Sequence, residues 1–144
     1  MRIAIASDHA AVGLRLEVAA HLVGLGHEVE DLGCDPDDRV DYPNYAAAVA
    51  GAVVAGGADK GILLCGTGLG MSIAANKMAK IRAALVHDVT TARLASAHND
   101  ANILCLGARV VGSVVALDCV DAWLTTAFEP RHQRRLDLIA ALED

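Results

Sequence analysis

Short apolar runs that alternate with helical segments constrain the fold of this chain more than any other feature. Five runs have the character of buried strands, and segments with apolar residues at helical spacing separate them. The strand-like runs span residues 2–7, 27–32, 60–65, 81–87 and 101–107. The helical segments span residues 9–25, 44–55, a stretch ending near 79, 90–98, 112–127 and 131–142. This order predicts a parallel sheet with helices on both faces.

The pattern therefore predicts a three-layer, Rossmann-like α/β fold with a five-stranded parallel sheet and an extra C-terminal helix. We expect residues 1–144 to form it as a single domain. Hydrophobic residues make up 54% of the chain but aromatic residues only 3%, so small aliphatic side chains must fill the core and allow close helix–sheet packing. Ligands of such folds bind beyond the carboxyl ends of the strands, which makes the segments that follow the strands the place to look for a site.

Composition excludes several function classes. The net charge of −6 and the pI near 5.4 argue against a nucleic-acid partner. No apolar run approaches the roughly 20 residues of a membrane span, and Asp8 and His9 come too early for a secretory signal. The four cysteines are widely spaced without a C-x-x-C pair, which predicts reduced thiols and a cytoplasmic location rather than a zinc knot or a thioredoxin motif.

The segment ILLCGTGLGMSIAANK, residues 62–77, places a glycine-rich loop between a buried strand and a helical segment. Glycines at a helix start let backbone N–H groups point at an anion, so the loop favours a phosphate or oxyanion cradle. The alternative is a tight strand-to-helix turn without a ligand. Three glycines at alternate positions exceed what one turn needs, which favours the cradle.

Three better-known loops fit this segment poorly. Met71 stands where a dinucleotide fingerprint needs its third glycine, and also where a phosphatase loop that begins at Cys65 needs its arginine. A P-loop would need Gly-Lys-Ser/Thr, which is absent. Asp88 could imitate a ribose-binding acid after the fourth strand, so a nucleotide-binding module without catalysis remains a second hypothesis.

Cys65 is the one cysteine that combines a strand end, a glycine loop and a helix start. That position favours the thiolate form, which can act as a nucleophile or as a base. The alternative is a buried structural cysteine, which is the role we expect for Cys105 and Cys119. Cys34 lies in an acidic loop without an activating cation nearby in the sequence.

Six motifs carry a resemblance to a known family. They are SDHA at 7–10, DYP at 41–43, CGTGLGMSIAANK at 65–77, AHNDAN at 97–102, GARVVG at 107–112 and RHQRR at 131–135. In these motifs the chain resembles type B ribose-5-phosphate isomerases, a family that includes the galactose-6-phosphate isomerase subunits, over nearly its whole length. The resemblance implies aldose–ketose interconversion of sugar phosphates without a metal or other cofactor. It also implies a homodimer, or a tetramer, with active sites shared across the dimer interface.

The resemblance also assigns roles to individual residues. It makes Cys65 the proton-abstracting base, Thr67 a hydroxyl that assists at the sugar oxygens, and His98 the ring-opening residue, with Asn99 bonded to the reacting oxygens. Some relatives use a glutamate instead of the thiol, but residues 69–73 hold no carboxylate. The other implied residues are the oxyanion-hole amides of Gly66, Gly68, Leu69 and Gly70, the substrate contacts Asp8, His9 and Tyr42, and the phosphate ligands Arg109, Arg131 and Arg135. Arg131 and Arg135 are expected to reach in from the partner subunit.

Each assignment has a plainer alternative. His98 could end a surface helix, and Asp8 or His9 could simply cap the first one. Arg131 and Arg135 have helical i, i+4 spacing, which would put both guanidinium groups on one face, to grip a phosphate or only to meet solvent.

The leading hypothesis is an isomerase that converts ribose 5-phosphate to ribulose 5-phosphate, through ring opening and a cis-enediolate. Galactose 6-phosphate, allose 6-phosphate or a tetrose phosphate are alternative substrates for the same chemistry. The motifs themselves leave the choice between a pentose and a hexose open.

Overall fold

Strands and helices alternate along the chain in this computed structural model, which describes residues 1–143; Asp144, the last residue of the predicted domain, lies outside them. The strands are β1 (Arg2–Ser7), β2 (Glu28–Asp31), β3 (Lys60–Cys65), β4 (Ala83–Leu85) and β5 (Ile103–Gly107). The helices are α1 (Val12–Gly24), α2 (Tyr42–Val54), α3 (Leu69–Ala75), α4 (Val89–Ala97), α5 (Ser113–Thr125) and α6 (Gln133–Ala140). Short 3₁₀ turns form at η1 (His9–Ala11), η2 (Pro130–His132) and η3 (Ala141–Glu143). Within residues 1–143, no helix combines the length and the apolar character that crossing a membrane requires.

All five strands in the described chain are parallel and lie in the order β2-β1-β3-β5-β4, which confirms the predicted fold class. The chain leaves β1 toward β2 on one side and later places β3 on the other side, so the direction of winding reverses between β1 and β3. A crevice forms at such a switch point, beyond the carboxyl ends of the strands. Cys65, at the end of β3, pairs with Gly107 at the end of β5 and therefore lies at this edge.

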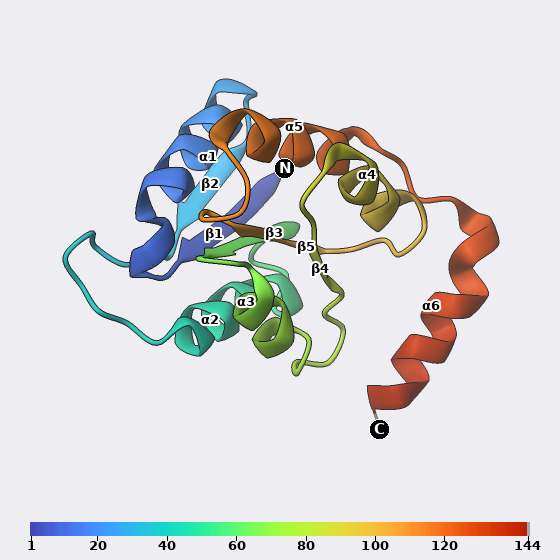
Figure 1. The fold of residues 1–144 in the computed structure, drawn as a ribbon. Helices are drawn as coiled ribbons and strands as arrows, with labels where there is room; N and C mark the ends of the chain where they lie inside the picture. The colour runs from blue at the N-terminus through green and yellow to red at the C-terminus, as the bar shows by residue number, and fades with distance from the viewer. Residues whose placement is uncertain (144) are drawn as a thin grey trace.

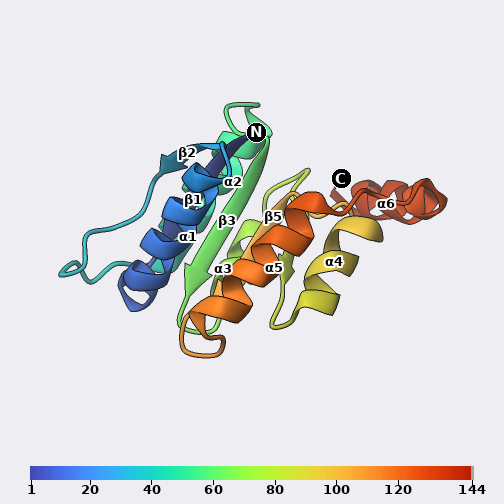
Figure 2. The same cartoon turned by 90° about the horizontal axis from the view of Figure 1, so that it is seen from above.

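The two faces of the sheet carry separate hydrophobic clusters. Helices α1, α4 and α5 cover one face, and α2 and α3 cover the other (Figure 1). Helix α6 lies beyond the sheet and away from both layers, as the view from above makes plain (Figure 2). Leu138 and Ile139 on α6 and Leu142 just after it are exposed, so α6 presents apolar surface to its surroundings.

Small side chains set the distance between the sheet and α2, as the composition predicts. Ala46, Val49 and Ala50 are fully buried against the sheet. A Cβ atom added to Gly61 of β3 would lie 2.5 Å from Cγ1 of Val49, so this glycine permits the close approach. The one tryptophan, Trp123, is fully buried on the opposite face and donates from Nε1 to the carbonyl of Ala101 at 3.0 Å.

Several predicted boundaries were wrong. Helix α2 begins at Tyr42, two residues before the predicted start at residue 44, because Pro43 is well suited to the start of a helix, where its missing N–H costs nothing. Helix α3 ends at Ala75 instead of near residue 79. The side chain of Asn76 then pairs with both backbone groups of Ala83, which fixes the turn that leads to β4.

A buried arginine, which the sequence analysis did not single out, connects several segments at the carboxyl edge of the sheet. Arg15 of α1 donates from Nε to Asp31 at the end of β2 at 3.2 Å. Its Nη1 atom donates to the Ser7 hydroxyl at 3.0 Å and to the Cys34 carbonyl at 2.8 Å. Gly33 leaves room for the guanidinium, because a Cβ atom there would lie 2.0 Å from Nη1. One cation thus joins β1, β2 and the loop that leads to α2.

We expect Arg15→Met to lower the free energy of unfolding by about 2–3 kcal/mol, because it leaves the Cys34 carbonyl without its donor and the partly buried Asp31 carboxylate without its cation. Urea denaturation measures the change. Arg134→Met, at an exposed position on α6, is the matched control and should change stability by less than about 0.5 kcal/mol. Equal effects of the two substitutions would contradict the assigned role of Arg15.

Candidate functional site

Cys65 ends β3 with its sulfur facing the start of α3. The residue is 6% exposed, and the backbone N–H of Gly68 donates to its Sγ atom at 3.1 Å. Gly68 caps α3 with a φ of 79°, a left-handed conformation that glycine adopts without steric cost. This conformation turns the chain so that an amide, rather than a side chain, meets the sulfur. An amide donor at this distance stabilises negative charge on sulfur.

Glycines on neighbouring elements let the loop pack closely against the sheet. A Cβ atom at Gly107 of β5 would lie 2.6 Å from the carbonyl carbon of Thr67. One at Gly68 would lie 2.5 Å from Leu85 Cδ1 and 3.0 Å from the backbone carbon of Leu106. The position of the loop therefore depends on close contacts with both β4 and β5.

The predicted oxyanion-hole amides are partly engaged within the loop itself. The Leu69 N–H donates to the Thr67 hydroxyl oxygen at 3.3 Å, while the Gly68 N–H donates to the Cys65 sulfur. Thr67 is exposed at the edge of the sheet. These two amides therefore orient the predicted base and the predicted hydroxyl.

Asp8 and His9 follow β1 at the same edge of the sheet. The Asp8 N–H donates to the Leu64 carbonyl at 3.3 Å, which places Asp8 beside the end of β3. Its carboxylate accepts from the Ala10 N–H at 3.0 Å and caps η1, as the simpler of the two predicted roles requires. Nδ1 of His9 accepts from the Val40 N–H at 3.3 Å, so a neutral His9 carries its proton on Nε2.

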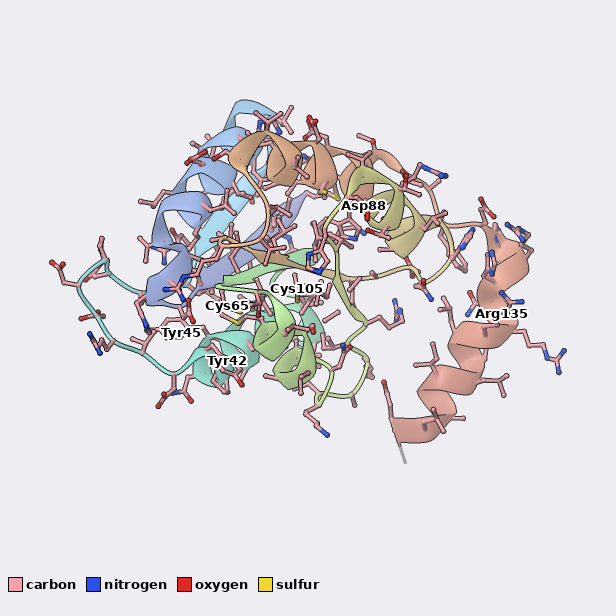
Figure 3. The ribbon with its side chains drawn as sticks, viewed as in Figure 1. Tyr42, Tyr45, Cys65, Asp88, Cys105 and Arg135 are labelled. Atoms are coloured by element: carbon pink, nitrogen blue, oxygen red, sulfur yellow. The ribbon has the colours of Figure 1, made fainter. Side chains whose placement is uncertain are left out.

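Tyr42 and Arg109 flank the glycine loop. The Tyr42 ring lies against Gly70, where an added Cβ atom would be 2.5 Å from its Cζ atom. Arg109 lies beside Gly66, with its Cδ atom 3.5 Å from the position that a Cβ would take there, and its N–H donates to the Gly66 carbonyl at 2.9 Å. The structure thus gathers a thiol, a hydroxyl, a phenol and a guanidinium around one loop. Figure 3 labels two of the residues that carry these groups, Cys65 and Tyr42.

The other core cysteines have no comparable surroundings. Cys105 and Cys119 are fully buried. Burial raises the pKa of the Cys105 thiol, and the neighbouring Cys65 raises it further; burial raises the pKa of Cys119 to about 11. Both thiols stay protonated at neutral pH, which fits their predicted structural role.

His98 and Asn99 lie at the opposite, amino edge of the sheet. Helix α4 runs antiparallel to the strands, so the residues that follow it lie where the strands begin. A hydrogen bond supports this placement, because the carbonyl of nearby Asn102 accepts from the N–H of Gly61 near the start of β3 at 2.9 Å. Gly61 and Cys65 are separated along β3 by about 13 Å. A single chain therefore does not bring His98 to Cys65, a separation that the sequence analysis did not foresee.

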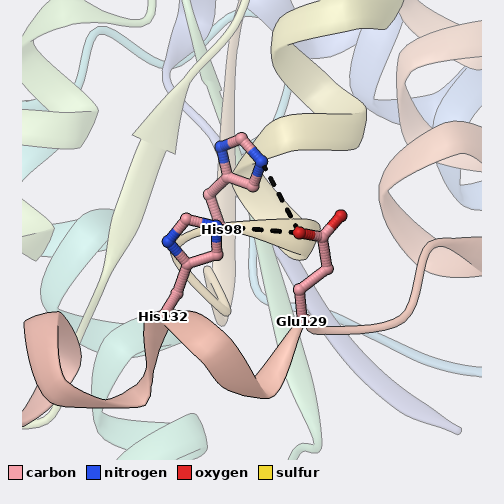
Figure 4. A group of neighbouring side chains, drawn as sticks. All are labelled: His98, Glu129 and His132. Atoms are coloured by element: carbon pink, nitrogen blue, oxygen red, sulfur yellow. Dashed lines mark ion pairs between the residues drawn. The ribbon is translucent and has the colours of Figure 1, made fainter.

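Arg131 and Arg135 also lie in this second region, around a cluster formed by His98, Glu129 and His132 (Figure 4). Arg131 pairs with the Glu129 carboxylate at 2.6 Å, and Arg135 donates to His132 Nδ1 at 3.2 Å. Arg131 belongs to η2 and only Arg135 to α6, so the single helix over residues 131–142 that the sequence predicts does not carry both. Both guanidinium groups nevertheless reach the same cluster.

Electrostatics differ among the members of this cluster. The hydrogen bond from Arg131 lowers the pKa of Glu129 below its usual value. Burial lowers the pKa of His132, and the charges of Arg131, His98 and Arg135 lower it further. At neutral pH the cluster thus combines an ionised carboxylate with a neutral imidazole at His132.

Sequence reasoning missed Glu129, His132 and Arg82. His132 stands inside the RHQRR motif, which was noted for its arginines alone. Arg82 donates to the backbone carbonyls of Asn99 and Asp100 at 3.1 Å each and so fixes the turn that carries His98. Its position just before β4 gave no signal in the sequence.

Comparisons with known proteins agree closely with one another. The family described as Ribose/Galactose Isomerase matches residues 3–139. The chain is 50% identical to a ribose-5-phosphate isomerase B of Escherichia coli, over 99% of this chain and 96% of that protein. It is 36% identical to the galactose-6-phosphate isomerase subunit LacB of Clostridium acetobutylicum, over 100% of this chain and 83% of that protein. The structure of Clostridium thermocellum ribose-5-phosphate isomerase B superimposes with a TM-score of 0.97, 49% identity and coverage of 99% and 97%.

We expect Gly68→Ala to lower the free energy of unfolding by about 2 kcal/mol or more, because it puts a side chain at positive φ and against the backbone of Leu106. Thermal denaturation checks this. Gly51→Ala, on a face of α2 with open space around it, should leave stability unchanged or raise it by up to about 1 kcal/mol. If Gly68→Ala proved as stable as Gly51→Ala, the loop would not need its left-handed residue.

Proposed function

The chain belongs to the ribose/galactose isomerase family, and on this premise we propose that it interconverts ribose 5-phosphate and ribulose 5-phosphate. The observation that carries the proposal is the Cys65 sulfur at the switch point of the sheet, held by the Gly68 amide. Identity of about half the residues over the full length of ribose-5-phosphate isomerases B supports the pentose over other sugars.

Galactose 6-phosphate is the second candidate substrate. The 36% identity to a galactose-6-phosphate isomerase subunit favours it over allose 6-phosphate or a tetrose phosphate. The chemistry at C1 and C2 is the same for all of these sugars, so the base and its amide donors would serve each of them. Only the room for one more carbon between the reacting end and the phosphate distinguishes the pentose from the hexose.

The proposed reaction transfers one proton between two carbons. The Cys65 thiolate removes the proton from C2 of the open-chain aldose, the electron pair forms the C1–C2 double bond, and negative charge develops on O1. The thiol then returns its proton to C1, while the C2 hydroxyl loses a proton to become the ketone and O1 gains one. Preorganised donors at such an oxyanion typically contribute about 100- to 1000-fold in rate.

Residues around the loop supply the remaining groups of the proposed site. Thr67 presents its hydroxyl, and the amides of residues 66–70 form the oxyanion hole, with those of Gly66 and Gly70 free of the two side-chain bonds that engage Gly68 and Leu69. Asp8 and His9 would contact the sugar from the segment that follows β1, and Tyr42 from the start of α2. Arg109, beside Gly66, faces the phosphate.

We propose that a second copy of the chain completes the site. His98 and Asn99, which would open the ring and bond the reacting oxygens, lie at the far edge of their own sheet, together with Arg131 and Arg135. In a homodimer, these four residues of one protomer would face the Cys65 loop of its partner. The exposed Ile73 of α3 and Leu138 of α6 offer apolar surface for such an interface.

A reducing compartment suits this chemistry. All four cysteines of the chain are free thiols. A thiolate base is inactivated when it oxidises, so we propose that the enzyme works in the cytoplasm, where thiols are kept reduced.

The first experiment is a turnover assay with ribose 5-phosphate, galactose 6-phosphate and a tetrose phosphate in metal-chelating buffer. We expect ribose 5-phosphate to give the highest kcat/KM, and Cys65→Ala to lower kcat by at least about 100-fold because the proton-abstracting base is gone. Cys34→Ala, which removes another buried thiol outside the glycine loop, is the matched control and should keep its turnover. Near-native kcat in Cys65→Ala would exclude Cys65 as the base.

The second experiment mixes two inactive variants, Cys65→Ala and His98→Gln, and allows their subunits to exchange. Half of the resulting dimers pair one copy of each variant, and each such dimer has one intact site if sites are shared. About a quarter of the wild-type activity should therefore return. A mixture whose subunits have exchanged, as checked by native mass spectrometry, and which stays inactive would place both residues in the same protomer's site.

A further inference from the structure

His98, Glu129 and His132 converge at the end of α4, in a cluster that the proposed reaction does not fully use (Figure 4). One nitrogen or oxygen atom from each residue lies within 4.8 Å of the others. The Glu129 Oε2 atom is 4.0 Å from His98 Nε2 and 3.7 Å from His132 Nε2. Ligands of a tetrahedral zinc ion, each about 2 Å from the metal, stand about 3.3 Å apart. Small side-chain movements would bring these atoms to that spacing.

The Nε2 atom of His132 is the second observation. His132 is 4% exposed, and its Nε2 has no hydrogen-bond partner within the described chain. Arg135 can only donate, so Nδ1 accepts its hydrogen bond and the neutral ring carries its proton on Nε2. That N–H faces Glu129 across 3.7 Å, which is too long for a hydrogen bond. Buried polar atoms rarely lack a partner, and an ion or an ordered water is one of the groups that satisfies such an atom.

We propose that His98, Glu129 and His132 bind a divalent transition-metal ion, with Zn²⁺ as the best fit. Two imidazoles and one carboxylate suit zinc, which commonly takes three protein ligands and keeps its fourth position open for water. Mg²⁺ and Ca²⁺ prefer oxygen ligands alone and fit this set poorly. Within one chain the three residues lie at the amino edge of the sheet and Cys65 at the carboxyl edge, so the thiol of the same chain is not a ligand.

Metal binding requires a rearrangement at His132 that the structure permits. The proton moves from Nε2 to Nδ1, and the exposed Arg135 releases the ring, so His132 binds the metal as a neutral imidazole without a net change in its proton count. Glu129 keeps its bond to Arg131, because a carboxylate offers about four lone-pair sites. The two guanidinium groups repel a dication, so the affinity should lie below that of a dedicated structural zinc site.

The consequence for activity rests on the proposed function. The metal would occupy the lone pair of His98 that ring opening uses, and its charge would repel the guanidinium group of Arg135 that the proposed reaction needs for the phosphate. Zn²⁺ is therefore an inhibitor in this account, and no step of the reaction passes through it.

Titration of the chelator-treated, full-length protein with Zn²⁺ by calorimetry, and with Co²⁺ as a visible-light probe, tests the site. We expect one metal ion per chain, with affinity lowered at least about tenfold in both Glu129→Gln and His132→Gln. His21→Gln is the matched control, since His21 also pairs with a carboxylate, that of Asp121, but lies in no cluster of three potential ligands in the described chain. Cys65→Ser should bind as the wild type does.

Absence of binding to the wild-type protein would overturn the proposal, as would binding that survives both cluster variants or disappears in Cys65→Ser. Circular dichroism verifies that each variant is folded. If His132→Gln fails to fold, Glu129→Gln still tests the site, because Glu129 is partly exposed and its substitution should not disturb the core. Metal binding is measured without substrate, so the result tests the metal site even if the protein shows no isomerase activity. Turnover in chelating buffer tests the proposed function independently of the metal.

Discussion

The hydrogen bond from the Gly68 amide to the Cys65 sulfur is the interaction on which the proposed chemistry depends. It requires a strand that ends in cysteine, two residues of loop, and a third in the left-handed conformation. Leu106 and Gly107 of β5 hold that loop at contact distance, so the neighbouring strand fixes the position of the donor. The sheet therefore determines where the sulfur points and also what it meets. In a water-filled loop the same thiol would have no fixed donor.

The parallel arrangement of strands explains why one chain brings together only part of the proposed site. Every segment that follows a strand lies at the carboxyl edge, and every segment that follows a helix lies at the amino edge. Cys65, Asp8 and Arg109 belong to the first group, whereas His98 belongs to the second. A site that needs both groups needs two copies of the chain. The shared site that we propose is thus a consequence of topology and not of any single contact.

Much of this could be predicted from the sequence because the alternation of apolar runs and helical segments is strongly patterned. The strand that ends at Cys65, the glycine loop and the carboxyl-edge positions of Asp8 and Arg109 all follow from that pattern and the rule for parallel sheets. The start of α2 did not follow from it, because Pro43 allows the first turn to form before the alanine-rich segment that marks the helix in the sequence. Contacts such as those of Arg15 join residues far apart in sequence, so the periodicity of apolar residues does not predict them.

The orphaned His132 nitrogen illustrates the same limit. The residues around His132 come from the end of α4, from the segment after α5 and from α6, so only the folded chain reveals that two imidazoles and a carboxylate meet. The RHQRR motif predicts positive charge in this region, which it has, but not the neutral ring at its centre. Local sequence identifies residue types, while the burial that changes their chemistry depends on tertiary packing.

Alkylation of the wild-type protein with iodoacetamide, followed by peptide mass spectrometry, tests the role of Cys65 most directly. The account predicts that modification of Cys65 and loss of isomerase turnover proceed in parallel, and that ribose 5-phosphate slows both to the same extent because it covers the sulfur. Full modification of Cys65 with turnover retained would contradict the account, as would a rate of modification that the sugar phosphate leaves unchanged.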